Sequence, residues 1–506
     1  MKGKIKNLHD LVEIVSELKL DGKKVVHCHG VFDLLHLGHI KHFEEAKTFG
    51  DILVVSITPD QFVNKGPGRP AFSTSNRLEA LSALMSVDFV IANKWPTAEE
   101  LIRALKPNVY CKGSDYKNHL DDITGKIKDE EIAVESIGGK ISYTDDVTFS
   151  SSALLNKFGD LYSKEQESLI QNIVTKNNFE DIDLKLSEIK KLKVLVIGET
   201  IIDQYVFCEA LGKSGKEPVL VLRDLDTQEY LGGALAISRH LSDFCETVSV
   251  LSFLGEDRQY ESFIEENIEE NINLNFLSKS NSPTIIKRRF VDNIDRKKIL
   301  GVYSINDNTL LKNEEEKFIQ AFDKLVKEHD LVIVSDYGHG IITTKIAKHI
   351  SQTDKFVSLN AQVNAANIGT HNIRKYQDIN CLIINAAELR HEMRQRDGDL
   401  DQMAITLKQM IGTKYIAVTQ GKDGAFLIKG NETPVKCPGF ALEIVDKIGS
   451  GDALLALLSV CLYCDFDEDL SLFISSIAAA QSVETIGNSE PVSKSKLLKT
   501  IFHLLK

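Results

Sequence analysis

The run HGVFDLLHLGH at residues 29–39 is the first group whose residue types and spacing suggest chemistry. Its histidines His36 and His39 are three residues apart, so on a helix they share one face. Two imidazoles on one face can stabilise the charge that develops on a phosphate during in-line attack. An isolated HxxH pair more often indicates a zinc pair or two surface histidines. Here the flanking residues GVFD lie between a predicted strand and a predicted helix, which favours a phosphate-binding role for the two histidines.

The run DKIGSGD at residues 446–452 is the second such group, and an apolar stretch follows it. Gly449 and Gly451 allow backbone N–H groups to converge into an anion-binding turn at the start of a helix. Asp452, at that start, can accept a hydroxyl proton while the γ-phosphoryl group leaves ATP. The alternative is a plain N-cap aspartate after a glycine loop, which carries no catalysis.

Both groups need a glycine turn that leads into a helix, because a helix N-terminus presents unpaired N–H groups and the positive end of its dipole. Short apolar strands that run into glycine are predicted at 25–30 and 194–198. Further strand-like runs, separated by segments of helix length, lie at 52–57, 248–253, 331–335 and 415–419. Strands that alternate with helices predict parallel sheets covered by helices on both faces, which is an α/β fold.

The length of the chain, 506 residues, allows about two to four domains with separate cores. Residues 162–191 are rich in Lys, Glu, Asn and Asp and poor in aromatic residues, which is typical of a connector. We therefore predict an N-terminal domain at 1–160, a linker at 161–190 and a larger C-terminal domain at 191–506.

The composition argues against several classes of partner. The 60 Lys and Arg residues against 73 Asp and Glu residues give a formal charge of −13, which is unsuited to nucleic acid or an anionic membrane. The first residues lack the apolar core of a signal peptide, and the longest apolar run, 453–464, is shorter than the roughly 20 residues of a membrane span. Eight cysteines are too few for a disulfide scaffold, and Cys461-x-x-Cys464 has no second pair to complete a zinc site. We expect a reduced, cytoplasmic enzyme.

The N-terminal group is part of a longer pattern. GxFDxxHxGH resembles the signature of the cytidylyltransferase-like nucleotidyltransferases, and the resemblance extends over nearly all of residues 7–158. It implies a Rossmann-like α/β fold in which His36, His39 and Lys65 are catalytic. Features that follow in order are KG at 65–66, an Arg that opens a helix over 77–85, KGSDY at 112–116 and the turn TFSSS at 148–152. The nucleotide and phosphate contacts that the resemblance implies are Gly30, Phe32, Asp33, Gly38, Arg77, Lys112, Gly113, Asp115, Ser150, Ser151 and Ser152.

The C-terminal group also belongs to a longer pattern. DxxGxGD resembles the signature of the ribokinase-like carbohydrate kinases, whose other motifs follow in order along residues 191–506. The resemblance implies an α/β domain with a small β lid, Asp452 as catalytic base, and Asn385 and Glu388 as the residues that organise Mg²⁺. The nucleotide contacts that it implies are Thr419, Gly421, Gly424, Gly449, Ser450 and Gly451. The sugar contacts that it implies are Asp203, Gly232, Gly233 and, on a basic run that can equally be a solvated surface, Arg289.

Two positions depart from the kinase pattern. Ala236 stands where the family has an Asn that contacts the sugar, and Asn360 begins NAQ where close relatives have Asp-Pro-Lys. Both changes remove polar or charged contacts near the sugar, whereas the motifs for phosphoryl transfer are intact. We therefore expect an active kinase with a shifted substrate, and a degenerate kinase domain is the alternative.

The two patterns on one chain imply chemically linked steps. Together they resemble the bifunctional heptose kinase and adenylyltransferase enzymes of lipopolysaccharide inner-core synthesis, although the transferase comes first here. The resemblance implies ATP-dependent phosphorylation of a sugar at its anomeric hydroxyl, then nucleotidyl transfer from ATP or CTP to the sugar 1-phosphate with release of pyrophosphate. Mg²⁺ is expected in both steps. Sugar phosphates and nucleoside triphosphates are the expected partners, and a small sheet near 206–225 can support a homodimer.

Two other functions remain open from the sequence. The N-terminal domain can be a polyol-phosphate cytidylyltransferase that uses CTP, followed by a divergent kinase or a ligand sensor. A metabolite-binding regulator built on both folds is the non-enzymatic alternative, but a pure binding protein does not need a positioned base such as Asp452. The fold alone does not decide between these functions.

Overall fold

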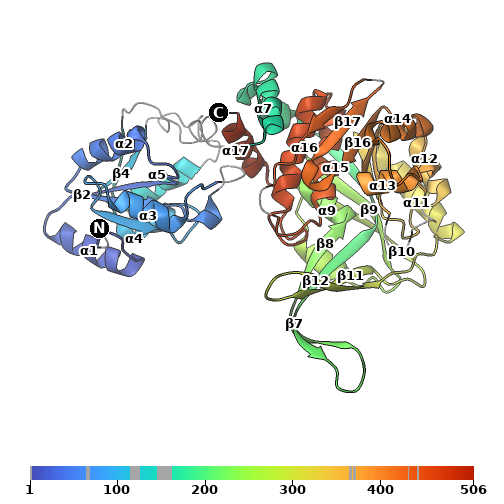
Figure 1. Cartoon of the computed structure of the whole chain (residues 1–506), viewed down its shortest axis with the longest axis horizontal. Coiled ribbons are helices and arrows are strands. Elements are labelled where there is room, and N and C mark those ends of the chain that lie inside the picture. Colours follow the sequence, from blue (N-terminus) through green and yellow to red (C-terminus); the bar gives the residue numbers. More distant parts are fainter. Residues whose placement is uncertain are drawn as a thin grey trace. The chain divides into compact units, whose positions relative to one another are not determined.

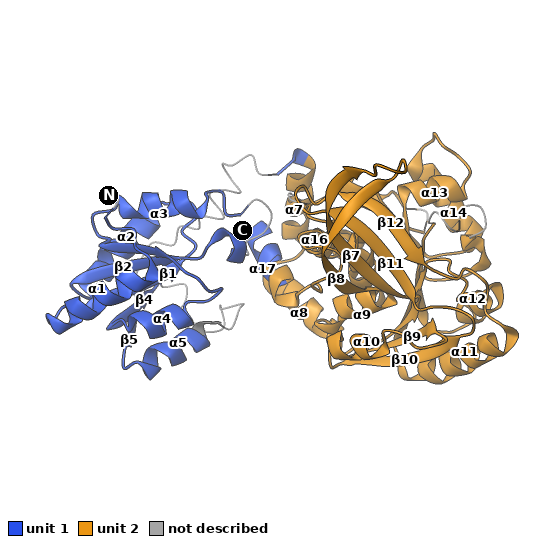
Figure 2. Ribbon diagram, turned by 90° about the horizontal axis from the view of Figure 1, so that it is seen from below, with its two compact units in different colours: residues 1–164, 498–506 blue, residues 165–497 orange. Residues whose placement is uncertain are grey.

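The chain forms two compact units, traced in Figure 1 and coloured separately in Figure 2. Unit 1 comprises residues 1–164 with 498–506, and unit 2 comprises residues 165–497. The computed structural model describes residues 3–63, 69–113, 126–144, 162–363, 367, 372–430, 432–441 and 444–505.

Unit 1 is built on a five-stranded parallel sheet with the strand order β3-β2-β1-β4-β5. Its strands are β1 (Val25–Gly30), β2 (Ile52–Ile57), β3 (Phe89–Ala92), β4 (Val109–Lys112) and β5 (Lys140–Tyr143). Its helices are α1 (Leu8–Leu20), α2 (Leu37–Thr48), η1 (Asp60–Phe62), α3 (Thr74–Ser82), α4 (Glu99–Leu105) and α5 (Lys126–Ser136). This order is the 3-2-1-4-5 arrangement of a Rossmann-like sheet, in which ligands bind beyond the carboxyl ends of the strands. The predicted fold class is confirmed for this unit.

The strands of unit 1 are central because their side chains are apolar on both faces. Leu53, Val54 and Val55 of β2 are all fully buried, as expected for a parallel strand covered by helices on both sides. Helix α3 begins at Thr74, three residues before the predicted start at Arg77. The Ser73 side chain accepts a hydrogen bond from the Asn76 N–H and so caps the helix earlier.

Unit 2 contains a nine-stranded sheet with the order β10-β9-β6-β13-β14-β15-β16-β17-β18 and a separate four-stranded sheet with the order β12-β11-β7-β8. Strands from β10 to β16 in the large sheet are parallel, and β17 and β18 are antiparallel. The strands of the large sheet are β6 (Lys193–Gly198), β9 (Thr247–Gly255), β10 (Ile272–Lys279), β13 (Leu331–Asp336), β14 (Phe356–Ala361), β15 (Cys381–Asn385), β16 (Tyr415–Thr419), β17 (Ala425–Lys429) and β18 (Val435–Cys437).

The helices of unit 2 cover the large sheet. They are α7 (Lys164–Lys176), α8 (Phe179–Ile189), α9 (Ala234–Ser242), α10 (Glu261–Asn267), α11 (Lys312–Leu325), η4 (Val326–Glu328), α12 (Thr344–Ser351), η5 (Ile373–Lys375), α13 (Ala386–Glu392), α14 (Leu400–Ile411), η6 (Gly421–Asp423), α15 (Ser450–Tyr463) and α16 (Glu468–Ser482). The last helix, α17 (Lys494–Leu504), begins in unit 2, and its residues from 498 on belong to unit 1. Within the part of the chain that the structure describes, none of the helices is both long and apolar enough to cross a membrane.

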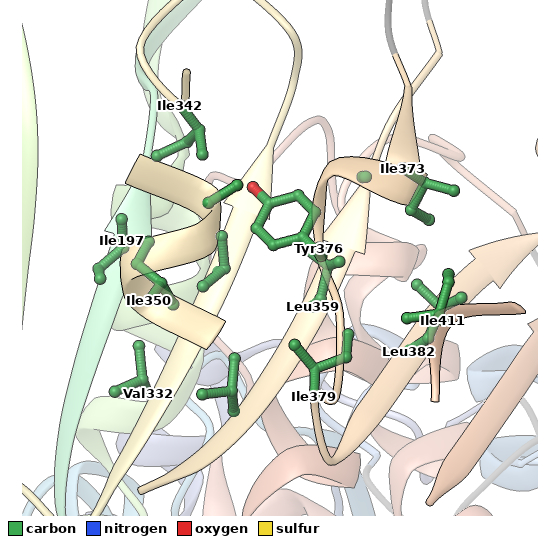
Figure 3. Packing of buried hydrophobic residues seen from close by; sticks show 14 of the residues in the cluster. Ile197, Val332, Ile342, Ile350, Leu359, Ile373, Tyr376, Ile379, Leu382 and Ile411 are labelled. Atoms are coloured by element: carbon green, nitrogen blue, oxygen red, sulfur yellow. The ribbon is translucent and has the colours of Figure 1, made fainter. Parts of the chain in front are cut away.

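One face of the large sheet forms a core with the helix α12 (Figure 3). Four neighbouring strands, β6, β13, β14 and β15, contribute one fully buried side chain each to this core: Ile197, Val332, Leu359 and Leu382. Ile350 of α12 belongs to the same buried cluster (Figure 3). Burying each such side chain stabilises the fold by about 1.5–3 kcal/mol. The packed core therefore fixes where the carboxyl ends of these strands lie.

The four-stranded sheet is the β lid that the sequence predicts. It consists of β7 (Thr200–Lys213), β8 (Leu220–Gly233), β11 (Ile285–Asp292) and β12 (Lys298–Ser304). Strand β7 follows β6 after a single residue, so the lid continues directly from the large sheet. The far half of the β7–β8 hairpin projects beyond the rest of unit 2 (Figure 1), and its side chains are exposed.

The segment between the two predicted domains is helical. Helices α7 and α8 occupy most of the predicted linker 161–190, and Asn178 caps α8 through a capping box with Asp181. Their buried side chains are Leu169, Ile170, Ile173, Ile182, Leu186 and Ile189. Both helices therefore have apolar faces that are packed, and compact unit 2 begins at residue 165.

Candidate active sites

In unit 1, the histidine pair of the HxGH motif lies at the start of α2. His36 is the N-cap residue, and His39 is in the first turn of the helix. The two imidazole rings stack with centroids 3.8 Å apart and planes 21° apart. Both side chains are half-buried. The structure thus brings the two predicted catalytic histidines together at a helix N-terminus, where the N–H groups favour anions.

Phe32 packs its ring against this pair through His39. Its ring contacts His39 edge-on at a centroid distance of 5.2 Å and Phe43 at 4.9 Å, inside the core of unit 1. The backbone of Phe32 has a φ of 49°, so the chain turns sharply there. A Cβ on Gly30 would lie 2.8 Å from the Phe32 ring. Glycine is therefore required at position 30 to let the ring fold under the motif.

Asp33 and Arg77, predicted as nucleotide or phosphate contacts, make hydrogen bonds within the protein. The buried carboxylate of Asp33 accepts hydrogen bonds from the Ala71 and Phe72 N–H groups at 2.9 and 3.0 Å. The Arg77 guanidinium donates to the carbonyl oxygens of Phe72, Val31 and Thr58, to Asp60 and, at 3.4 Å, to Thr74. These bonds use all five of its N–H donors. Both residues therefore hold the loop beside the motif, and their predicted contacts with the nucleotide or its phosphates stay predictions.

Lys112 lies at the end of β4 and is paired with an acid that the sequence did not point to. Its Nζ is 2.7 Å from Glu130 Oε2, and the Tyr110 hydroxyl donates to the same carboxylate at 3.1 Å. Gly113, the next residue, has open space around the position of a Cβ. The ion pair with Glu130 holds the Lys112 ammonium group at the carboxyl edge of the sheet, where the predicted nucleotide contact would be made.

A buried hydrogen-bond chain beneath the motif was also missed. The Ser56 hydroxyl lies 2.8 Å from His27 Nε2 and 2.7 Å from His29 Nδ1, and Thr58 Oγ1 lies 3.2 Å from His29 Nε2. Burial lowers the pKa of both histidines to about 3. Both are therefore neutral, and they fix the end of β1 rather than supply charge. In the sequence, HCHG signals this only through the alternation of His27 and His29.

Five residues predicted for this site lie outside the described residues. They are Lys65, Asp115, Ser150, Ser151 and Ser152. Gly38, the remaining one, is buried in the first turn of α2, between the two histidines.

In unit 2, the DxxGxGD motif forms a turn that leads into α15. Gly449 is the N-cap residue with a φ of 97°, and Ser450 Oγ donates to the Lys447 carbonyl oxygen at 3.2 Å. A Cβ on Gly449 would lie 2.1 Å from Asn488 Oδ1, whereas a Cβ on Gly451 would meet nothing within 4 Å. The turn therefore requires glycine at 449 and leaves the helix N-terminus open at 451.

The first motif residue, Asp446, fastens this turn to the lid. It accepts hydrogen bonds from the Tyr205 hydroxyl at 2.6 Å and from Lys298 Nζ at 2.5 Å. It also accepts from the Gly487 N–H at 3.2 Å. Tyr205 comes from β7 and Lys298 from β12, so one carboxylate joins two lid strands to the glycine turn.

Asp452, the predicted base, is buried in the first turn of α15. Burial raises the pKa of its carboxyl to about 7, the Tyr337 hydroxyl that donates to Oδ1 at 2.9 Å lowers it, and the charge of Asp203 raises it further. Lys287 Nζ lies 5.0 Å from the centre of the Tyr337 ring. A carboxyl with a pKa near 7 suits general-base chemistry at neutral pH. Tyr337 follows β13 directly, and no sequence motif that we singled out pointed to it.

The predicted sugar contacts lie together on the strands of the lid sheet. Asp203 of β7 forms an ion pair with Arg289 of β11. A Cβ on Gly232 would lie 2.3 Å from Asp203 Oδ2, so glycine leaves room for this carboxylate. Gly233, with a φ of 62°, is the N-cap residue of α9. Ala236 in that helix is buried.

A second buried carboxylate, Glu199, organises the loop that carries Tyr337. It accepts hydrogen bonds from the Tyr337 and His339 N–H groups at 2.9 and 3.0 Å. Burial raises its pKa to about 7, and the charge of Asp336 acts in the same direction. Lys375 Nζ lies 2.6 Å from Asp336 Oδ2. This network holds the end of β13, and thus Tyr337, in register with α15.

Asn385 and Glu388, the predicted magnesium residues, form a capping box at the start of α13. The Asn385 side chain accepts from the Glu388 N–H at 2.8 Å, and Glu388 Oε2 accepts from the Asn385 N–H at 3.1 Å. Burial raises the pKa of Glu388 to about 7. The oxygen donors fit a hard divalent cation, whose charge would offset the cost of burying this carboxylate.

The predicted nucleotide turn lies beside that capping box. Thr419 of β16 pairs in register with Asn385 of β15. The following turn has positive φ at Gly421 (63°) and Gly424 (90°), and a Cβ on Gly424 would lie 2.0 Å from the Cys437 carbonyl oxygen. Asn360, on the neighbouring β14, donates through Nδ2 to the Ile383 carbonyl oxygen at 2.9 Å. Asn360, Asn385 and Thr419 thus lie at the carboxyl ends of three neighbouring strands of the large sheet.

Family models match both parts of the chain. The model described as pfkB family carbohydrate kinase matches residues 191–495, and the model described as Cytidylyltransferase-like matches residues 27–158. These matches confirm the predicted pairing and order of the two domain types.

The chain is also similar to individual relatives and to solved structures. The Bifunctional protein HldE of Campylobacter jejuni (strain RM1221) is 28% identical over 302 residues, which are 59% of this chain and 62% of that protein. The Bifunctional protein HldE of Geotalea uraniireducens (strain Rf4) is 44% identical over 141 residues, 28% of this chain and 27% of that protein. The matches therefore span less than two thirds of these relatives. The structure of Arabidopsis thaliana ribokinase complexed with ribose and ATP is 18% identical, with a TM-score of 0.47 over 62% of this chain and 99% of that one.

Proposed function

Because the chain belongs to the pfkB family of carbohydrate kinases through residues 191–495, we propose that it makes a nucleotide-activated sugar in two steps. The C-terminal domain, 191–506, phosphorylates a sugar, and the N-terminal domain, 1–160, transfers a nucleotidyl group to the product. One observation carries this proposal: each compact unit has its own helix N-terminus for phosphate, with a reactive side chain in the first turn. These side chains are His39 on α2 and Asp452 on α15.

In the kinase step, Asp452 accepts the proton of the anomeric hydroxyl as that oxygen attacks the γ-phosphorus of ATP. ADP leaves, and the sugar 1-phosphate remains. The open N–H groups after Gly449 stabilise the charge on the transferred phosphoryl group. Mg²⁺, organised by Asn385 and Glu388, would neutralise charge on the phosphates of ATP. Asp203 and Arg289 orient the sugar under the lid.

In the transferase step, a phosphate oxygen of the sugar 1-phosphate attacks the α-phosphorus of a nucleoside triphosphate, and pyrophosphate leaves. His36 and His39 stabilise the negative charge that builds on the α-phosphate. Lys65, Lys112 and the turn at Ser150–Ser152 hold the remaining phosphates in this proposal.

The substrate that we favour is heptose-like, by resemblance to the bifunctional enzymes of inner-core synthesis, with ATP or CTP as the nucleotidyl donor. Ala236 and Asn360 remove polar groups that the kinase pattern would place near the sugar, so its specificity is the least constrained part of the proposal. Because both steps consume nucleoside triphosphates, we place the enzyme in the cytoplasm.

We also propose that the enzyme is a homodimer joined through the lid sheet. The proposal is supported by the apolar side chains that the lid leaves exposed on its two edge strands, β8 and β12. They are Leu220, Val221, Leu225, Ile299, Leu300, Val302 and Tyr303.

The test separates the two activities in the full-length protein. We expect Asp452→Asn to lower sugar phosphorylation at least about a hundredfold, while nucleotidyl transfer onto a supplied sugar 1-phosphate continues. His39→Ala should have the converse effect. Products are identified by mass spectrometry from a mixed pool of heptose, other sugar and polyol phosphates with ATP or CTP.

The controls are Asp465→Asn and His9→Ala, which change exposed residues in the same two units. Both should keep both activities. Loss of both activities in one folded catalytic-site variant would refute two separate sites. A product formed only from CTP and a polyol phosphate would show a polyol-phosphate cytidylyltransferase instead.

A further inference from the structure

Three soft metal ligands meet between the sheet of unit 1 and helix α2, outside the candidate active sites. They are Cys28 of β1, Cys111 of β4 and His42 of α2, which we call the Cys–His cluster. One ligand atom from each lies within 4.8 Å of the others. Cys28 and Cys111 are direct neighbours in the register of the parallel strands. Their thiols are therefore side by side on the same face of the sheet.

We propose that the Cys–His cluster is a zinc site that fastens α2 to β1 and β4. Two thiolates and a neutral imidazole are a ligand set that Zn²⁺ prefers. In a tetrahedral site with ordinary bond lengths the ligand atoms are roughly 3.5–3.8 Å apart. Only a small contraction from the observed spacing is needed, and the fourth position is left to a small oxygen ligand such as water.

The charge of the complex suits its buried position. Cys28 and Cys111 are 0% and 1% exposed. Two thiolates balance the charge of Zn²⁺, so the assembled site is neutral and avoids the cost of burying net charge. Metal binding would displace both thiol protons.

His42 already has the kind of partner that an imidazole ligand needs. Its Nδ1 lies 2.9 Å from the hydroxyl of the buried Thr144. Imidazoles that bind zinc usually hydrogen-bond through the other ring nitrogen, which fixes the ring orientation. With Nδ1 engaged in this way, Nε2 is the atom that we assign to the metal.

The site would act on the position of α2. His42 lies one turn after His39, and the same helix begins at His36. A metal bond from α2 to the two central strands would therefore hold the stacked histidines at the carboxyl edge of the sheet. Metal binding itself does not depend on the proposed function, so it can be tested without a substrate.

The experiment measures zinc binding by the full-length protein after removal of metal. Zn²⁺ is titrated in competition with a chromogenic chelator, and Co²⁺ serves as a spectroscopic probe of thiolate ligation. We expect one tight zinc per chain and a thiolate-to-cobalt charge-transfer band. Cys111→Val and His42→Gln should each weaken zinc binding by more than about a hundredfold, which exceeds the usual effect of losing an outer partner. Zinc should also raise the unfolding temperature of the wild type.

The matched control is Cys381→Val, which changes another buried strand cysteine, in unit 2. It should bind zinc like the wild type. Thr144→Val keeps all three ligands and should weaken binding about ten- to a hundredfold, which provides a test if Cys111→Val does not fold. Any of four results would overturn the proposal. They are a zinc stoichiometry unchanged by both ligand substitutions, zinc lost only with His36→Ala, absence of the charge-transfer band, and a Cys28–Cys111 disulfide in the purified protein.

Discussion

At the scale of single residues, the pair formed by Asp452 and Tyr337 lies at the centre of the proposed kinase site. The carboxyl is buried, and burial raises its pKa to about 7, while the hydrogen bond from Tyr337 acts against that rise. Tyr337 is itself fixed by Glu199, which accepts its backbone N–H. The base is therefore tuned by one hydroxyl whose position does not depend on the substrate.

This pair predicts a pH dependence. Asp452 must be ionised to accept a proton, so phosphorylation should fall as the pH drops below about 7. Tyr337→Phe removes a bond that favours the ionised form, so the midpoint should move to higher pH by about half to one unit. The measurement is kcat/KM for sugar phosphorylation against pH. The control is Tyr463→Phe, which changes a partly buried tyrosine on α15, the helix that carries Asp452. If the midpoint in Tyr337→Phe stayed or moved to lower pH, the proposed effect of Tyr337 on the pKa of Asp452 would be contradicted.

Residue types near a motif were predictable, but their hydrogen bonds were not. Stacked His36 and His39, and Asp452 in the first turn of its helix, follow from spacing alone because neighbouring turns of a helix set their positions. Arg77 and Asp33 were predicted to contact phosphate, yet their polar atoms bind backbone groups of the adjacent loop. Such partners come from segments distant in the chain, and one sequence does not reveal them.

At the scale of elements, the turn before α15 is the most constrained piece of backbone in the kinase site. Gly449 combines a φ of 97° with an approach of 2.1 Å between the position of its Cβ and Asn488 Oδ1. Among the described residues, both polar atoms of the Asn488 side chain are buried without a hydrogen-bond partner. The amide group therefore serves here mainly to cover the turn.

We expect Gly449→Ala to abolish sugar phosphorylation and to destabilise unit 2, with nucleotidyl transfer unchanged. The left-handed backbone costs about 1–2 kcal/mol for a residue with a Cβ, and the collision with Asn488 adds to it. The double variant Gly449→Ala/Asn488→Ala should recover the part due to the collision only. Urea unfolding measures the free energies.

Gly451→Ala is the stability control for this turn, because its Cβ would meet nothing within 4 Å. It lies inside a helix, where replacing glycine by alanine should stabilise by about 0.5–1 kcal/mol. Equal destabilisation by the two glycine substitutions would show that backbone conformation does not constrain the turn at 449.

The elements themselves were largely predictable from the apolar pattern. The strands at 52–57 and 415–419 match β2 and β16 residue for residue, because short runs made mostly of apolar residues leave little choice of where a strand begins and ends. The helix predicted to open at Arg77 begins earlier, at Thr74, because the Ser73 side chain caps it. The Cys–His cluster was invisible, since Cys28, His42 and Cys111 come from three elements far apart in the chain.

At the scale of the molecule, each unit contains its own candidate site, and the lid sheet of unit 2 leaves apolar side chains exposed on its edge strands. Leu220 on β8 is 57% exposed, and Leu300 and Val302 on β12 are 55% and 46% exposed. Both strands are edges of the four-stranded sheet. Edge strands with exposed apolar side chains are the usual place for pairing with another chain.

The lid gives the prediction for the assembled protein. If two lids pack together, burying this apolar surface contributes about 25 cal/mol per Å², and a lysine in its centre must lose its hydration. Val302→Lys and Leu220→Lys should therefore convert the dimer to a monomer at micromolar concentration, as measured by sedimentation velocity. Leu184→Lys changes a similarly exposed leucine on α8, away from the lid, and should leave the mass unchanged. A wild-type monomer, or a dimer that survives both lid substitutions, would show that the lid surface does not join two chains. Because Asp203 and Arg289 lie on the inner strands of the same sheet, loss of the dimer should also raise the KM for the sugar more than it lowers kcat.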